Sequence, residues 1–209
     1  MSTRGLLART VAGVTGAVLL TGVAGAAFAD PVDGEAENVE IGVTIDGLEP
    51  AGALTMSVAS SSTELAEVDT DEEGIRRFDG TLPTVTVTDD RDVAPESAYW
   101  YVTGQSSDFT AAEGDATLPA GHLGWTPEVL TDNDGEVAAG DQVLTILDEG
   151  PDAVGLVGEE LLALALDSTE AAATGTWQAN ADLFLKTPED VPAGDYSATL
   201  TLTLWEDSY

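Results

Sequence analysis

The amino-acid sequence predicts an all-β protein, a two-sheet antiparallel β-sandwich with Greek-key-like connections and at most one short helix. Two observations support this prediction. Apolar side chains alternate with hydroxyl-bearing or acidic ones over several short segments, which is the period of a half-buried strand. Glycine and proline residues separate these segments at short intervals, as turns do in antiparallel sandwiches. A closed barrel is the alternative architecture.

The first 29 residues are predicted to be a signal peptide and no part of the fold. Two arginines and no acid occur in residues 1–9, an uncharged stretch follows over 10–29, and it ends in Ala27-Phe28-Ala29. Small residues three and one before a cut are what signal peptidase accepts. An uncleaved membrane anchor is the alternative, because about 20 residues can span a bilayer. We expect cleavage, export and then an acidic flexible leader over residues 30–38.

One β-sandwich domain is expected over residues 39–209. Period-two alternation predicts its strands at 39–45, 54–58, 84–88, 98–103, 142–147, 176–185 and 196–204. The last segment is the clearest, because one of its faces is apolar and the other carries serine and threonine. Residues 154–166 fit both periods, and we expect a turn of helix that leads into a strand there.

The charge of the chain restricts its partners. There are 39 acidic residues and six Lys or Arg, and after residue 29 four cations and 39 acids remain, a net charge of −35. Without a basic patch the protein cannot neutralise phosphates, so nucleic acid and, after cleavage, a membrane surface are poor partners. The acids are interpreted as a solvated coat, with binding of divalent cations as the alternative. The lack of cysteine excludes disulfides, thiolate metal sites and cysteine nucleophiles.

The sequence contains no recognisable catalytic set, and we predict a non-catalytic protein without a cofactor. The single histidine, His122, lies in a predicted loop, and no serine occupies a Gly-x-Ser-x-Gly elbow. A zinc site without thiolates would usually need more than one imidazole. A glycan hydrolase that uses two carboxylates is the alternative.

An acidic segment resembles the middle of an EF-hand calcium loop. If Gly135 is the central glycine of such a loop, its first ligand position falls on Leu130, which cannot coordinate a cation. The flanking residues are strand-like instead of helical, so a polar turn is the expected structure. The calcium candidates in this segment are Asp132, Asp134, Glu136 and Asp141.

Several aromatic segments resemble, in order, the WxL-type surface domains of Gram-positive bacteria in a divergent actinobacterial form. The similar segments are 100–102, 107–109, 123–125, 175–177, 182–185 and 191–204. Val102 replaces the leucine of the first WxL motif, and Leu202 stands where the family has its second tryptophan. The resemblance implies secretion, a β-rich fold and noncovalent attachment to peptidoglycan.

Three tryptophans are the candidate contacts with the wall polymer or its glycan: Trp100, Trp125 and Trp205. Trp125, between a glycine and a nearby proline, is expected in a loop with an exposed ring, and Trp205 follows the last strand. Trp100 and Trp177 lie in strand patterns, where packing in the core is the competing interpretation. An exposed aromatic ring can stack on a sugar while nearby carboxylates accept hydrogen bonds from its hydroxyls.

The sequence therefore predicts a secreted, non-catalytic protein of the cell surface. We expect it to associate noncovalently with the cell wall as a binding or structural module, with peptidoglycan or other surface proteins as partners. Residues 82–85 and 118–121 only begin like a sortase substrate, and no terminal apolar segment follows them, so covalent anchoring is not expected. A calcium- or salt-adapted adhesion domain is the alternative.

Overall fold

The structure, a computed structural model, describes residues 52–132 and 134–209. The predicted signal peptide, the acidic leader and the predicted strand at 39–45 lie outside the described residues. The described part forms an all-β sandwich of antiparallel sheets, as the sequence predicts. All of it belongs to one compact unit. No helix in the described part is long and apolar enough to cross a membrane.

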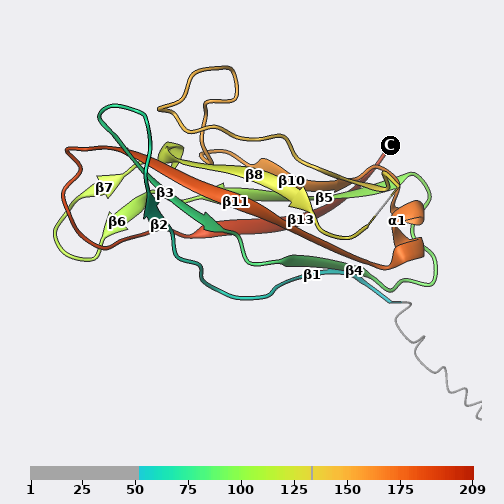
Figure 1. The fold of residues 1–209 in the computed structure, drawn as a ribbon. Helices are drawn as coiled ribbons and strands as arrows, with labels where there is room; N and C mark the ends of the chain where they lie inside the picture. Colours follow the sequence, from blue (N-terminus) through green and yellow to red (C-terminus); the bar gives the residue numbers. More distant parts are fainter. Residues whose placement is uncertain (1–51, 133) are drawn as a thin grey trace, which may run out of the picture. The chain divides into compact units, whose positions relative to one another are not determined.

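The larger sheet is organised around the long strand β11 (Thr176–Pro188). One edge of β11 pairs with β4 (Val85–Asp89) and β3 (Ile75–Thr81), and the other edge pairs with β8 (Leu123–Val129). β1 (Leu54–Val58) extends the sheet beyond β4, and β2 (Ala66–Val68) does so beyond β3. Figure 1 shows β11 crossing the molecule, with β8 along one side and β4 along the other.

β3 and β4 form one interrupted strand beside β11, and a proline explains the interruption. Leu82 still donates its N–H to the Ala181 carbonyl at 2.8 Å. Pro83 has no N–H to donate to the ladder, so regular pairing resumes only at Val85. The interruption lets β1 and β2 occupy different stretches of the same outer edge.

The second sheet contains β13 (Leu200–Ser208), β5 (Ala98–Ser106), β10 (Glu160–Ala165) and β9 (Val137–Ala139), in that order. Consecutive strands often lie in different sheets, as from β4 to β5 and from β10 to β11, which is the connectivity of a sandwich and not of a meander.

A third, small sheet closes one end of the sandwich and divides the predicted strand at 196–204. It contains β6 (Phe109–Ala111), β7 (Thr117–Leu118) and β12 (Tyr196–Ser197). The chain then breaks before β13 joins the second sheet, so the single predicted strand is two strands. Figure 1 shows the small sheet and the α-helix α1 (Ser168–Thr174) at opposite ends of the sandwich.

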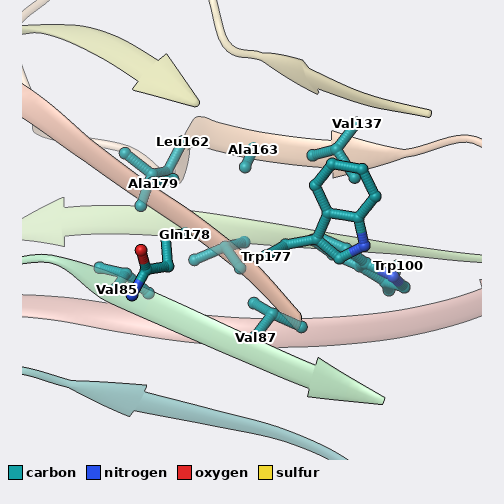
Figure 2. Close-up of a pocket in the computed structure, with 10 residues that line it drawn as sticks. Val85, Val87, Trp100, Val137, Leu162, Ala163, Trp177, Gln178 and Ala179 are labelled. Carbon is teal, nitrogen blue, oxygen red and sulfur yellow. The ribbon is translucent and has the colours of Figure 1, made fainter. Parts of the chain in front are cut away.

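The side chains between the two main sheets form one apolar core. Its largest buried members are Trp100, Trp125, Leu156, Leu162, Val85 and Val102. Trp177 is also buried there, and its indole N–H donates to the Ala171 carbonyl of α1 at 2.9 Å. Figure 2 shows side chains of both sheets that line a small void in this core. The volume of the void is about 10 Å³, which is close to the space that one water needs. The core is therefore closely packed.

The prediction of a helical turn within residues 154–166 is wrong. Residues 160–165 are strand β10, where burial of Leu162, Ala163 and Ala165 in the sandwich overrides the helical period. The helix begins after it, at Ser168, because Asp167 caps its N-terminus by accepting the Thr169 N–H at 2.8 Å. It ends at Gly175, whose φ of 77° is the left-handed conformation that glycine favours.

The predicted strand at 142–147 is reduced to two isolated bridges, at Val143 and Leu144. Thr145, the next residue, does not continue the strand because its backbone and side chain are hydrogen-bonded to Asp148. The Asp148 carboxylate accepts hydrogen bonds from both the N–H and the hydroxyl of Thr145, at 2.9 and 2.7 Å. A side chain that bonds to nearby backbone in this way favours a turn over a strand.

Candidate functional site

Two of the three candidate tryptophans are buried. Trp125 was expected in an exposed loop, and this expectation is wrong, because Trp125 lies within β8 and its side chain is 0% exposed. Its ring reaches across the core to Gly104 of β5, where any side chain would come within 2.6 Å of the indole. Trp100 is 1% exposed and belongs to the same core. Neither ring can contact a polymer outside the folded protein.

Trp205 is the candidate that the structure leaves accessible, and it lies on the outer face of the second sheet. Trp100 and Val102 of β5 point into the core, so the intervening Tyr101 and the preceding Tyr99 point outward. Trp205 of β13 is the register partner of Tyr101 and is 39% exposed. The sandwich therefore shows aromatic side chains of two neighbouring strands on this one face.

Four rings form a continuous series that we call the aromatic row: Tyr209, Tyr99, Tyr101 and Trp205. Successive ring centroids are 4.8, 6.0 and 6.4 Å apart, and the ring planes deviate from parallel by 32°, 18° and 22°. The ring at one end of the row, Tyr209, is 79% exposed. Such ring pairs are favourable in themselves, and the two end rings leave surface for a ligand.

Hydrogen bonds hold the two ends of the aromatic row. The Trp205 indole N–H donates to the Thr103 hydroxyl at 3.1 Å, on the neighbouring strand β5. The Tyr209 N–H donates to the Ser97 carbonyl at 3.1 Å, which continues the pairing of β13 with β5 beyond the last ladder position. The rings are thus placed by backbone pairing and one side-chain bond before any ligand arrives, which reduces the entropy that binding must remove.

A buried ion pair fixes β13 to the other sheet. Arg91 donates to Asp89 of β4 at 2.6 and 2.7 Å and to Glu206 of β13 at 2.7 Å. The Asp89 side chain is 2% exposed and that of Arg91 is 13% exposed. The hydrogen bonds from Arg91 lower the pKa of Asp89, and those to Asp89 and Glu206 raise the pKa of Arg91. The strand that carries Trp205 is therefore anchored in the core structure.

The surroundings of the aromatic row are apolar and acidic. Leu164 of β10 is the register partner of Tyr101, and Leu166 beyond it is exposed. Asp207 is the partner of Tyr99, whose pKa is raised by partial burial and by the Asp207 charge. In the described part of the chain the cations lie on or just after strands of the larger sheet, at Arg76, Arg77, Arg91 and Lys186.

Trp205 was predicted as a contact residue from the sequence, but Tyr99, Tyr101 and Tyr209 were not. The signal for two of them was present, because a tryptophan that packs in the core on a strand directs both of its neighbours to the opposite face. Whether Tyr209 lies next to Tyr99 depends on the register of β13 against β5. The alternation of residues within one segment does not specify that register.

The structure does not bring the four calcium candidates together. In the segments 52–132 and 134–209, no group of three or more His, Asp or Glu side chains is placed to hold a metal ion. The Glu136 carboxylate instead accepts the Asp134 N–H at 2.7 Å, as in a polar turn. His122, predicted in a loop, is buried in a short 3-10 turn and donates from Nδ1 to the Lys186 carbonyl at 2.7 Å.

No protein-family model matches the sequence, and no curated protein matches it. The resemblance to WxL domains therefore stays a prediction. The two segments with the motif-like patterns are nevertheless neighbours in the fold, because Val102 of β5 is the register partner of Leu204 in β13. Residues 100–102 and 202–204 thus share one sheet, and the aromatic row lies on its outer face.

Proposed function

We propose that this protein is an exported, non-catalytic cell-surface module that binds a cell-wall glycan noncovalently through the aromatic row. The observation that carries the proposal is the continuous series of four aromatic rings on the outer face of one sheet, with Trp205 and Tyr209 exposed at its ends. A contiguous exposed aromatic surface on a soluble domain is typical of a binding site.

The chemistry of the aromatic row suits a sugar polymer. The C–H face of a pyranose ring is apolar and can cover an exposed indole or phenol ring, while its hydroxyls stay in contact with polar groups at the rim. Asp207, Thr203 and the tyrosine hydroxyls supply acceptors beside the rings. Repulsion from the acidic surface favours a polymer with little net negative charge along the contact.

Peptidoglycan is the proposed wall polymer, for two reasons. Its glycan strands present sugar rings in series, which matches rings placed in a row and not in an enclosed pocket. The resemblance of residues 100–102 and 191–204 to WxL domains implies the same polymer, and the structure places the strands of these segments side by side.

Co-sedimentation with purified peptidoglycan tests the proposal. We expect the mature protein to sediment with the wall, and the variants Trp205→Ala and Tyr101→Ala to lose at least about tenfold in affinity, because each removes one ring of the aromatic row. The matched control is Tyr196→Ala, which removes a tyrosine from the small third sheet. Failure of the wild type to sediment, or equal binding by all three variants, would contradict the proposal.

Export has its own test. We expect the protein recovered outside the cell to begin at Asp30, because Ala27 and Ala29 occupy the positions that signal peptidase recognises. N-terminal sequencing of secreted material measures this directly. Retention of the full chain in the membrane fraction would instead favour the uncleaved anchor.

A further inference from the structure

The outer face of the larger sheet contains a polar hollow of about 470 Å³, on the side of the sandwich opposite the aromatic row. Outward-pointing side chains of two paired strands form its floor. Three register pairs of β3 and β11 make up this floor, which we call the grid: Arg77 with Lys186, Asp79 with Phe184, and Thr81 with Asp182. Thr126 of β8, together with Gln142, Leu144 and Asp148 of the segment after β9, completes the wall. A hollow of this volume is in the range of small-ligand sites.

Lys186 is a structural member of the grid and has little capacity left for a ligand. It is buried, and its ammonium donates to Asp148 at 2.6 Å and also to Glu72. Burial alone would lower the pKa of Lys186, but these hydrogen bonds outweigh it and raise the pKa. The pairing fixes the loop that contains Asp148 over this end of the hollow.

Arg77 is the cation of the grid that remains available. Its Nε donates to Asp79 at 2.7 Å, and its guanidinium lies 5.4 Å from the centre of the Phe184 ring. The two terminal amino groups of Arg77 make no hydrogen bond to the described residues, and the side chain is 37% exposed. A guanidinium over an aromatic ring, with two terminal amino groups that make no hydrogen bond to the described residues, can receive a carboxylate.

Asp182 provides the opposite charge at the other end of the grid. It is exposed, faces Thr81, and its carboxylate makes no hydrogen bond within the described residues. Beside it, Gln142 donates to the Thr126 hydroxyl at 2.8 Å, so both polar side chains are held at the rim. Asp182 can therefore accept an ammonium group.

The spacing of these two residues along the sheet is compatible with the length of a dipeptide. The Arg77 guanidinium lies over Phe184, and Asp182 is two residues from Phe184 on the same strand, which is roughly 7 Å along β11. The two ends of an extended dipeptide are about 7 Å apart, since each residue spans up to about 3.6 Å. A dipeptide that lies along β11 would therefore bring its carboxylate beside Arg77 and its ammonium beside Asp182.

We propose that this hollow binds a short peptide with free termini, with the carboxylate on Arg77 and the ammonium on Asp182. Leu144 contacts its small side chains, and Thr126 and Gln142 hydrogen-bond its peptide group. A polyanion does not fit, because Asp79, Asp148 and Glu72 surround the two cations. The site is separate from the aromatic row and does not depend on glycan binding.

Calorimetric titration of the mature protein with alanyl-alanine tests the proposal. We expect binding with a Kd of about 1 mM or tighter, and about a tenfold loss for Arg77→Gln and for Asp182→Asn, since each removes one charge-assisted contact. The N-acetylated dipeptide lacks the ammonium, so its weaker binding should not change further in Asp182→Asn. The C-terminal amide should likewise be insensitive to Arg77→Gln.

Two control variants show whether a loss of dipeptide binding is specific to this hollow. Arg76→Gln removes the same charge one residue away, but Arg76 points to the other side of the sheet and pairs with Glu67 at 2.8 Å, so binding should be unchanged. Trp205→Ala should also leave dipeptide binding unchanged while it reduces sedimentation with the wall. No binding of alanyl-alanine by the wild type, or an equal loss in Arg76→Gln and Arg77→Gln, would overturn the proposal. If Arg77→Gln does not fold, Asp182→Asn with the free and acetylated dipeptides decides the question.

Discussion

The two outer faces of the sandwich differ although the same alternation of residues builds both. On β5 and β13 the outward positions hold Tyr99, Tyr101 and Trp205, whose rings contact one another. On β3 and β11 they hold charged residues, with Arg77 paired to Asp79 and Lys186 paired to Asp148. The first face is suited to apolar sugar faces and the second to a charged, polar ligand.

This contrast shows that the inward and outward side chains of a β-sandwich can serve different purposes, stability and binding. The inward residues of both sheets share one core and are restricted by packing, whereas many outward residues, such as Trp205 and Asp182, contact solvent and can carry their own chemistry. The consequence of a substitution in a strand therefore depends on whether the side chain points into the core or away from it. Inward changes should affect stability, and outward changes should affect binding.

The largest effect should come from neighbouring aromatic residues on β5. We expect Trp100→Ala to lower the free energy of unfolding by about 3–5 kcal/mol, because it leaves a large cavity in a closely packed core. Tyr101→Ala, one residue away and outward, should lower it by about 1 kcal/mol or less. Urea denaturation measures both, and equal losses would contradict the assignment of the two faces.

Removal of Arg91 should have the next largest effect. Arg91→Gln leaves Asp89 buried without its partner, and we expect a loss of about 3 kcal/mol in the free energy of unfolding. Arg76→Gln is the matched control, because its pair with Glu67 is exposed, and its loss should stay below about 1 kcal/mol. Similar losses in both variants would show that the Arg91 pair does not anchor β13.

The loss in the free energy of unfolding that Arg91→Gln causes should depend on pH. The pKa of Asp89 is lower in the folded protein than in the unfolded chain, where it is about 3.9. The stability from this pair is therefore present above about pH 4 and is lost as the pH falls through the folded pKa. Denaturation curves from neutral to acid pH should show the wild type and Arg91→Gln converging. A difference that stays constant would contradict the ion-pair account.

Salt should have the smallest of these effects on stability. Repulsion among the acids, at a net charge of −35 after residue 29, opposes the compact state. Raising NaCl from about 0.05 M to about 1 M screens it, and we expect a gain of about 1–2 kcal/mol, or several degrees in Tm. A calorimetric Tm that falls with salt would indicate that ion pairs outweigh the repulsion.

The sequence predicted the fold class and those strands whose alternation is local and strong, as at 84–88 and 98–103, but it did not predict β3 or β8 of the larger sheet. It misplaced the helix because the cap at Asp167 and the glycine at 175 were weaker signals than the run of leucines before them. It misplaced Trp125 because burial of that ring depends on Gly104, a residue of the opposite sheet. The aromatic row and the polar hollow could not be predicted from one segment, because each combines residues that are distant in the sequence. The aromatic row needs the pairing of β13 with β5, and the polar hollow needs the pairing of β11 with β3.

The most direct test follows the four indole N–H signals of the protein by NMR while peptidoglycan fragments are added. Trp100, Trp125 and Trp177 are buried and Trp205 is exposed, so the tryptophans are built-in reporters of the two environments. The account predicts that the Trp205 signal shifts in a saturable way while the other three stay in place. A Trp205 signal that does not move at any fragment concentration, or shifts confined to the buried indoles, would contradict it.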